Sequence, residues 1–358
     1  MQIHQVLVSA APGDAVTDAA FELRRLLRRL GPSDLYARYI HPELEDEVEE
    51  LDHYGERAST TLEDDVLVFH ASIGEPAVFA FLRDRPERLV VDYHNISPAA
   101  PFYPYDPAFA GLLEAGRREV AALASRATLA LADSAYNAAE LAAMGYADVR
   151  VAPLIVDVEP LTAAPELDGA LPESLDGPVM LFVGQLLPHK RPDFLIQAFH
   201  VLSTYLLPEA HLVLVGAHRL PRYTQALRFL LSELNLRRVV LTGPVTDDEL
   251  AAWFRRADLF CTASEHEGFC VPLLEAMAFG VPIVARHFAA VPETLGDAGL
   301  LLPPDAGATV TAEAMGRLVD DRRLHAGLAE RGRARLAEFD PDAARATVLS
   351  HLMSVLGS

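Results

Sequence analysis

The sequence predicts an α/β protein built from two doubly wound parallel-sheet domains that face each other across a cleft. Short apolar runs rich in β-branched residues alternate with helical patterns along the chain, as in parallel sheets built from βα units. This alternation stops near the middle of the chain and then restarts, and 358 residues exceed what one hydrophobic core usually holds. We therefore expect one domain at 1–160, a second at 161–340, and a C-terminal helix at 341–358 that packs back towards the first domain.

In the first half, six apolar runs are expected as strands, at 4–9, 34–39, 65–70, 88–94, 127–133 and 149–153. The first helix is expected to begin near Thr17 and to end at Gly31 and Pro32, because this pair stops helices. The break follows at Val158–Pro178, which is rich in proline, glycine and acidic residues and shows no periodicity. This composition is typical of a linker between domains.

In the second half, strands are expected at 179–184, 211–216, 238–243, 258–263 and 282–285, and helices at 192–202, 223–234, 246–257 and 273–279. Thr246 and Glu249 form a capping-box pattern at the start of the third of these helices. The first three strands end in Gly184, Gly216 and Gly243. Ligands of open α/β sheets bind beyond the carboxyl ends of the strands, where a glycine lets the ligand approach the backbone.

The charge and the cysteine content exclude several classes of protein. A formal net charge of −21 opposes a general nucleic-acid surface, which requires positive fields. Apolar runs are shorter than the roughly 20 residues of a membrane span, and the first residues lack the features of a signal peptide. The two cysteines, Cys261 and Cys270, cannot form a disulfide framework in a chain of this length. We therefore expect a cytoplasmic protein with reduced cysteines.

Two basic segments stand out from this acidic background. One is the cluster of His189, Lys190 and Arg191. The other is the helix expected around Phe21–Leu30, where Arg24, Arg25, Arg28 and Arg29 interleave with leucines at helical spacing. This helix either makes a weak contact with the inner face of the membrane or with a partner, or it packs its leucines on a sheet as an ordinary amphipathic helix.

The segment Ser264–Ala285 places two acidic residues around a short apolar helix. Glu275 is the only charged residue of the helix, and Glu267 precedes it by eight positions. A carboxylate in such surroundings is costly unless it is hydrogen-bonded. Pro272 suits the first helical position, but no preceding residue offers a capping oxygen. The free N–H groups predict an anion site. The alternative is that water or a neighbouring loop accepts their hydrogen bonds. For Glu275, the alternative to a ligand is a buried Arg or Lys partner.

Lys190 supports the anion site, because it follows the first strand of the second half at the same sheet edge. An ammonium group opposite a helix start suits a diphosphate. Glu275 would then lie near a ribose, whose paired hydroxyls match the two oxygens of a carboxylate, and Glu267 would meet a sugar on the other side.

These residues resemble a known family. Glu267 and Glu275, with seven residues between them in "SEHEGFCVPLLEAMAFGVPIVA", are similar to the signature of retaining glycosyltransferases of family 4, which have the GT-B fold of two Rossmann-like domains. "LFVGQLLPHKRPDFLIQAF" and "LTGPVTDDELAAWFRRADLFCTAS" also resemble that family. In the first half, "DYHNISPAAPFYPYDP" and "ADSAYNAAEL" look like a bacterial subgroup tied to mannosyl transfer in surface polysaccharides.

The resemblance implies a role for each matching residue. Glu275 would bind the nucleotide ribose, Glu267 would hold hydroxyls of the donor sugar, and Lys190 would pair with the diphosphate. The catalytic group would consist of Glu267, Lys190 and His94, which ends a strand of the first half; the alternative for His94 is a purely structural role. The remaining donor-site residues would be Gly184, Gln185, Gly268, Phe269 and Cys270, the last three through backbone N–H groups.

The chain departs from the family pattern at two places. Gln185 stands where the family usually has an arginine, so one positive charge is missing; Arg191, Arg219 and Arg222 are candidates to replace it. In the expected acceptor loop, Gly13 and Asp14 stand where many relatives carry paired glycines.

The implied reaction is the transfer of a hexose-type sugar from a GDP- or UDP-linked donor to an acceptor hydroxyl with retained configuration, in polysaccharide or glycoconjugate biosynthesis. The partners would be a nucleotide sugar and a carbohydrate or lipid-linked acceptor. No cofactor and no metal would be required, because protein groups stabilise the leaving diphosphate. The alternatives are a GT-B sugar epimerase, and a nucleotide-sugar-binding or partner-subunit protein without turnover.

Overall fold

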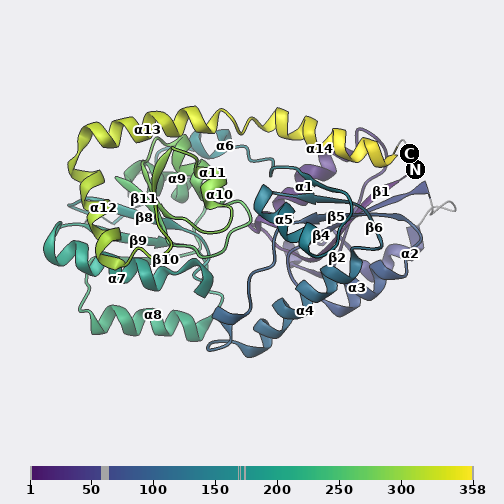
Figure 1. The fold of residues 1–358 in the computed structure, drawn as a ribbon, viewed down its shortest axis with the longest axis horizontal. Coiled ribbons are helices and arrows are strands. Elements are labelled where there is room, and N and C mark those ends of the chain that lie inside the picture. Colours follow the sequence, from purple (N-terminus) through teal and green to yellow (C-terminus); the bar gives the residue numbers. More distant parts are fainter. Residues whose placement is uncertain (1, 58–63, 168, 170, 173–174, 357–358) are drawn as a thin grey trace. The chain divides into compact units, whose positions relative to one another are not determined.

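The computed structural model describes residues 2–57, 64–167, 169, 171–172 and 175–356. The chain divides into two compact units, each with its own parallel sheet. Unit 1 comprises Met1–Ala100, Ala108–Ile155 and Pro341–Ser358, and unit 2 comprises Pro101–Pro107 and Val156–Asp340. Figure 1 shows the helices and strands of each unit.

Unit 1 contains a seven-stranded parallel sheet in the order β3-β2-β1-β4-β5-β6-β7. Its strands are β1 (Ile3–Ala10), β2 (Leu35–Ile40), β3 (Glu49–Glu50), β4 (Val66–Ala71), β5 (Arg88–Tyr93), β6 (Ala127–Ala132) and β7 (Val149–Val151). Its helices are α1 (Ala15–Leu27), α2 (Tyr54–Arg57), α3 (Pro76–Arg83), α4 (Pro107–Leu123), α5 (Ala135–Ala143) and α14 (Pro341–Leu356). All six predicted strands are present. The prediction missed β3, which consists of two glutamates and has no apolar pattern.

The first helix differs from its predicted bounds at both ends. It begins before Thr17 because the side chain of Asp14 accepts a hydrogen bond from the Thr17 N–H and caps the helix. It ends at Leu27, and the chain continues in tighter turns, in which the N–H groups of Leu30 and Gly31 both donate to the Leu27 carbonyl.

The leucines of α1 pack in the core of unit 1. Leu23, Leu26 and Leu27 are buried in one cluster with strand residues and with Val348, Leu352 and Val355 of α14. Three of the arginines pair with acidic side chains of unit 1: Arg24 with Glu47, Arg25 with Glu22, and Arg28 with Asp34. The structure therefore favours the ordinary amphipathic helix over the membrane-contact alternative.

Unit 2 contains a six-stranded parallel sheet in the order β10-β9-β8-β11-β12-β13. Its strands are β8 (Val179–Val183), β9 (His211–Val215), β10 (Val239–Gly243), β11 (Leu259–Thr262), β12 (Ile283–Arg286) and β13 (Gly299–Leu302). Its helices are α6 (Glu159–Thr162), α7 (Pro192–Tyr205), α8 (Pro221–Glu233), α9 (Asp247–Arg256), α10 (Val271–Ala278), α11 (Val291–Leu295), α12 (Ala308–Asp320) and α13 (Arg322–Leu336). The predicted strands are present, and the edge strand β13 was not predicted.

Two local predictions for unit 2 have different outcomes. The capping box of α9 is present, with the Glu249 N–H donating to Thr246 Oγ1 and the Thr246 N–H donating to Glu249 Oε2. The segment Val158–Pro178 was expected to lack regular structure, but it contains the short helix α6, and Arg255 of α9 donates hydrogen bonds to the carbonyls of Thr162 and Pro165. Residues 168, 170, 173 and 174 of this segment lie outside the described residues.

Both sheets have the strand order of doubly wound Rossmann-like folds, so the fold class is confirmed. The order reverses between β1 and β4 in unit 1 and between β8 and β11 in unit 2. The crevice beyond the carboxyl ends of such neighbouring strands is where these folds bind ligands. The topology therefore directs attention to the loops after β8 and β11.

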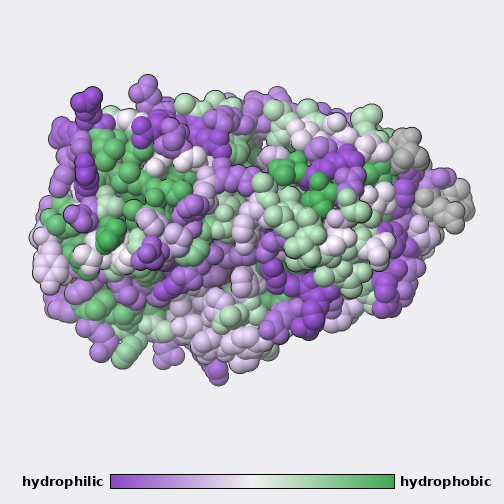
Figure 2. All heavy atoms as spheres, viewed as in Figure 1, coloured by the Kyte–Doolittle hydropathy of each residue, from purple (hydrophilic) through white to green (hydrophobic). Residues whose placement is uncertain are grey.

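Hydrophilic and hydrophobic residues are interspersed on the face drawn in Figure 2. Among the described residues, no helix has both the length and the apolar character needed to cross a membrane.

Candidate functional site

Lys190 lies on the loop that follows β8. The chain leaves this strand through Gly184, whose φ of +152° favours glycine, and then forms a 3₁₀ turn at Pro188–Lys190. The Lys190 side chain runs back beside Gly184, since a Cβ atom added there would lie 3.3 Å from Lys190 Cδ. The sequence contains no other lysine. A compact ammonium group is thus placed at the switch point of the second sheet.

Glu267 follows β11 and binds Lys190 directly. Lys190 Nζ lies 2.9 Å from Glu267 Oε1 and 3.1 Å from Oε2. Burial opposes the charge on Lys190, but the Glu267 carboxylate outweighs it and holds the pKa of the ammonium above its ordinary value. The side chains are 19% and 11% exposed, so this is a shielded ion pair with only a small surface open to a ligand.

The start of α10 lies beside this pair. Cys270, the N-cap residue, has a left-handed φ of 78°, and no side chain caps the helix. The loop is fixed by Thr294 Oγ1, which donates to the Phe269 carbonyl at 2.6 Å. Burial raises the pKa of the Cys270 thiol well above its ordinary value, and the charges of Glu267 and Lys190 both reach it. Because the thiol is buried, it stays protonated and adds no negative charge at the helix start. The N–H groups and the dipole of the helix can therefore attract an anion.

Glu275 lies one turn into α10 without a partner for one of its oxygens. Within the described part of the chain, its Oε2 atom is shielded from solvent and has no hydrogen bond. Burial, and to a lesser extent the nearby Asp247, raise the pKa of this carboxyl to about 7. The alternative of a buried Arg or Lys partner does not hold among the described residues, where Glu275 forms no ion pair. An unpaired buried acceptor of this kind is unusual and needs a donor.

The other basic residues of the predicted cluster are engaged or neutral. Arg191 pairs with Asp193 and Glu265, and Arg286 also lies 3.3 Å from Glu265. His189 is buried, and burial holds its pKa well below the ordinary value, so it is neutral. The cluster is therefore not a free basic patch, and Arg191 is bound to acids instead of replacing the missing arginine.

Gln185 follows β8, and Arg219 and Arg222 follow the neighbouring strand β9. All three therefore lie near the carboxyl ends of these strands. Gln185 is half-buried directly after Gly184. Arg219 is exposed just before α8, and Arg222 is exposed in its first turn.

The strand-end glycines Gly216 and Gly243 differ in their surroundings. A Cβ atom on Gly216 would lie 2.0 Å from the Gly184 carbonyl oxygen, whereas a Cβ atom on Gly243 would meet nothing within 4 Å. Gly216 is thus required by the close approach of the chain after β8, and the expectation that all three glycines serve a ligand is too simple.

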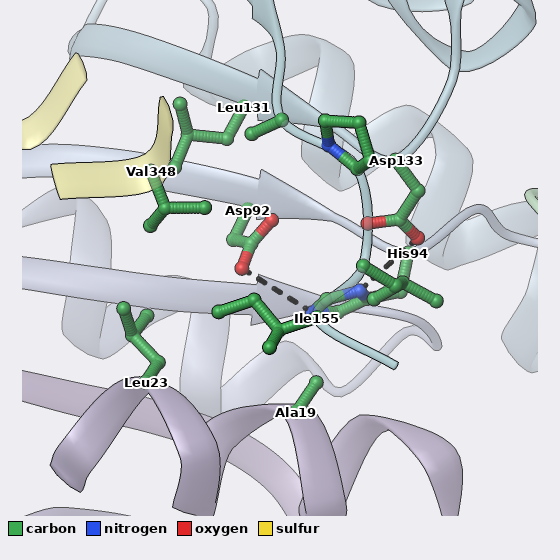
Figure 3. Close-up of a pocket in the computed structure, with 11 residues that line it drawn as sticks. Ala19, Leu23, Asp92, His94, Leu131, Asp133, Ile155 and Val348 are labelled. Carbon is green, nitrogen blue, oxygen red and sulfur yellow. Dashed lines mark hydrogen bonds and ion pairs between the residues drawn. The ribbon is translucent and has the colours of Figure 1, made fainter. Parts of the chain in front are cut away.

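His94 of unit 1 belongs to a buried polar cluster at the end of β5. Its Nδ1 atom lies 3.2 Å from Asp133 Oδ2, and its Nε2 atom lies 2.8 Å from His70 Nδ1. Figure 3 shows Asp92, His94 and Asp133 at one end of a cavity that has apolar side chains on its other sides. Both ring nitrogens of His94 are engaged, and its side chain is 4% exposed.

The charges in this cluster follow from burial and from its acids. Burial opposes a charge on His94, but Asp133 and Asp92 outweigh it and raise the pKa of His94 to about 9. Burial raises the pKa of Asp92 to about 6 and holds the pKa of His70 well below its ordinary value. The sequence reasoning missed His70, Asp92 and Asp133; the Asp-Tyr-His spacing at the end of β5 was the available signal.

The predicted acceptor-loop residues have a structural role as well. Asp14 caps α1 through its bonds with Thr17, and Gly13 has a positive φ of 68° with open space around it.

Comparisons with known proteins agree with this architecture. Residues 164–335 match the family model described as "Glycosyl transferases group 1". A D-inositol 3-phosphate glycosyltransferase of Xylanimonas cellulosilytica is 32% identical over 212 residues, which are 56% of this chain and 50% of that protein. The O-antigen chain mannosyltransferase B of Escherichia coli is 31% identical over 161 residues, 44% of this chain and 41% of that protein. The matches thus span half or less of these relatives.

Among solved structures, the Anabaena protein HepE in complex with UDP-glucose is similar, with a TM-score of 0.75 and 19% identity. The similarity covers 99% of this chain and 100% of that chain, and at this level of identity it concerns the fold. The chain therefore has the GT-B fold, and its residues 164–335 match the glycosyl transferases group 1 family.

Proposed function

We propose that this chain is a retaining glycosyltransferase that moves a hexose-type sugar from a GDP- or UDP-linked donor to a hydroxyl group of a carbohydrate or lipid-linked acceptor. The observation that carries the proposal is the Lys190–Glu267 pair beside the uncapped start of α10. It lies at the switch point between β8 and β11, where doubly wound folds bind nucleotides.

The diphosphate would bind between Lys190 and the start of α10. Negative charge grows on the leaving diphosphate in the transition state, and preorganised positive groups at that place lower the barrier. Lys190 is held by Glu267 through two hydrogen bonds and needs little rearrangement to serve this role. Because the ammonium and the helix dipole supply the positive charge, we propose that no metal is needed at the diphosphate.

The two acids would bind the groups on either side of the diphosphate. Glu275 has an unpartnered, shielded oxygen that two ribose hydroxyls would satisfy. Glu267 would share its carboxylate between Lys190 and the hydroxyls of the donor sugar. The acceptor hydroxyl would attack on the face from which the diphosphate leaves, and a phosphate oxygen would take its proton. The bond from the anomeric carbon to phosphate oxygen breaks as the bond to the acceptor oxygen forms, so the configuration is retained.

Two first-half assignments stay predictions. A contact of His94 with the reacting sugar would require a ring nitrogen to leave Asp133 or His70. A role of Gly13 and Asp14 at the acceptor would add to the capping role of Asp14.

The names of similar proteins support a hexose donor. The Escherichia coli relative is a mannosyltransferase of the O-antigen chain, and the Anabaena structure holds UDP-glucose. We extend these properties to this chain as part of the proposal, including a place in polysaccharide or glycoconjugate biosynthesis.

The test is a thermal-shift and calorimetric screen of UDP, GDP and ADP and of their sugars, followed by NMR of the anomeric product with a panel of acceptors. We expect one donor to bind and to yield a product of unchanged anomeric configuration. If no nucleoside diphosphate binds, the proposal is wrong. An epimerised sugar without acceptor would establish the epimerase, and binding without turnover on the whole panel would establish a binding protein.

Gln185→Arg tests the missing charge within the same screen. An added guanidinium beside the diphosphate should tighten donor binding by about tenfold, as one charge-assisted hydrogen bond would. Glu313→Gln, which raises the net charge by the same one unit at an exposed residue of α12, is the control and should leave the affinity unchanged.

A further inference from the structure

Three ligand atoms of unit 1 converge on one point. His70 Nδ1 lies 2.8 Å from His94 Nε2, and Asp92 Oδ2 lies 3.4 Å from the first and 3.5 Å from the second. The topology brings them together, because His70 and Asp92 are register partners on the neighbouring strands β4 and β5. His94 follows Asp92 by two positions and therefore lies on the same side of the sheet.

The outer nitrogen of each histidine faces an oxygen. His70 Nε2 lies 2.8 Å from Gln5 Oε1, and His94 Nδ1 lies 3.2 Å from Asp133 Oδ2. A neutral imidazole that donates from one nitrogen presents a lone pair on the other. When both rings are neutral and donate outwards, the two inner nitrogens direct lone pairs towards each other and towards the Asp92 carboxylate. Three acceptors at these distances need a positive ion between them, either a metal or a proton.

We propose that His70, Asp92 and His94 form a binding site for a divalent transition metal of the Zn²⁺ class. The point equidistant from the three ligand atoms lies about 1.9 Å from each, and zinc binds histidine nitrogen and carboxylate oxygen at about 2.0–2.2 Å. Two imidazoles and one carboxylate are a known ligand set for such ions. The outer oxygens of Gln5 and Asp133 correspond to the second contacts that orient metal-binding histidines.

The cavity beside the cluster supplies room for a fourth ligand. It has a volume of about 30 Å³, and its lining includes Asp92, His94 and the apolar side chains of Leu23 and Ile155 (Figure 3). That volume is enough for a water molecule at the open position of a four-coordinate metal. The metal would link the end of β4, through His70, to the end of β5, through Asp92 and His94. All of its ligands belong to unit 1, so this proposal does not depend on the diphosphate site of unit 2.

A proton is the other positive ion that can fill this place. In that state His94 is protonated, in agreement with its pKa of about 9, and donates from Nδ1 to Asp133 and from Nε2 to His70 Nδ1. His70 is then neutral and donates from Nε2 to Gln5 Oε1. The two occupants differ in a measurable way, because a metal displaces the hydrogen between the two rings.

The experiment uses the full chain after removal of metal with a chelator. Co²⁺ titration should show one bound ion per chain with visible absorption bands, and Zn²⁺ should displace it. Asp92→Ala and His70→Ala should each weaken Co²⁺ binding by about 100-fold or more, and Asp133→Asn should weaken it by about 10–100-fold. His4→Gln, which changes another buried histidine of the same sheet, should leave binding unchanged. Asp92→Asn keeps the side-chain shape and serves if the alanine variants do not fold.

Three results would overturn the proposal. The first is a lack of one-to-one binding by the unchanged protein at micromolar metal. The second is unchanged affinity in folded Asp92→Asn or His70→Ala. The third is an NMR spectrum in which a hydrogen remains between His70 and His94 in the presence of equimolar Zn²⁺, because the site would then hold a proton instead of a metal.

Discussion

Lys190 and Glu267 are 77 residues apart in the chain and form a shielded ion pair, with Nζ 2.9 and 3.1 Å from the two carboxylate oxygens. The pair exists because β8 and β11 are neighbours in the sheet, so the loops that follow them meet at one edge. Each residue holds the other in place, and a ligand that brings both a diphosphate and a sugar can bind to the two together.

Lys190 is the only lysine in the chain, and we expect that neither Met nor Arg can replace it. Lys190→Met leaves Glu267 without its partner, and Lys190→Arg places a planar guanidinium beside Gly184, where the lysine stem already packs closely. Each should weaken binding of the donor nucleotide by about 10–100-fold in calorimetry. Arg317→Ala, a change of an exposed residue on α12, should be silent. An unchanged affinity in both lysine variants would contradict the proposed diphosphate site.

The same lysine gives a direct test of contact. Expression with ¹³C-labelled lysine labels Lys190 alone, so its NMR signal can be followed without assignment of other lysines. We expect this signal to shift when the donor nucleotide is added and to be missing in Lys190→Met. A labelled Lys190 signal that does not move at saturating nucleotide would place the diphosphate elsewhere.

Glu275 should make the stability of the protein fall as pH rises. Its pKa of about 7 in the folded protein lies above the ordinary value of 4.5, so the fold prefers the protonated acid. The stabilisation is complete below pH 4.5 and is lost as pH rises through 7, by about 1–3 kcal/mol. Urea unfolding at pH 5.5 and 8.5 should show this loss in the unchanged protein. Glu275→Gln should reduce it by about 1–3 kcal/mol and leave the loss of the same sign that His94 contributes, whereas Glu313→Gln on the exposed face of α12 should keep the full loss.

Nucleotide-sugar binding should show the opposite dependence on pH. Ribose hydroxyls donate to the ionised form of Glu275, so binding favours loss of its proton and tightens as pH rises from 6 to 8, by at most about tenfold per unit below the pKa. Calorimetry in two buffers of different ionisation enthalpy should detect the released proton. A nucleotide sugar is the suitable ligand, because its diphosphate does not titrate in this range. Proton release that persists in Glu275→Gln would assign the effect to another group.

Gly216 and Gly243 should respond differently to alanine. Gly216→Ala places a Cβ atom 2.0 Å from the Gly184 carbonyl oxygen, so either the backbone after β8 moves or the protein unfolds. We expect a loss of at least about 2–4 kcal/mol. Gly243→Ala has open space and only the strain of a φ of 77°, about 1–2 kcal/mol. Equal melting temperatures for the two variants would contradict this packing.

The alternation of strands and helices and most local features follow from the order of the residues along the chain. Buried strands such as β4 and β8 are apolar runs, and the capping box of α9 can be read from Thr246 and Glu249 because it involves only neighbouring residues. Of the two edge strands that the prediction missed, β3 consists of two glutamates and has no apolar pattern, whereas β13 is an apolar run of only four residues. The helices α6, α11, α12 and α13 were not predicted either. The uncapped start of α10 and its lone acid can also be read from the sequence.

Which distant side chains meet depends on the packing of the whole fold. Local periodicity sets the type of an element but not its neighbours in the sheet, and strand order depends on packing between segments far apart in the chain. For this reason the sequence pointed to Lys190 and Glu267 without showing that they bind each other. It singled out His94 without His70 and Asp133, which reach it only because β4, β5 and β6 lie side by side.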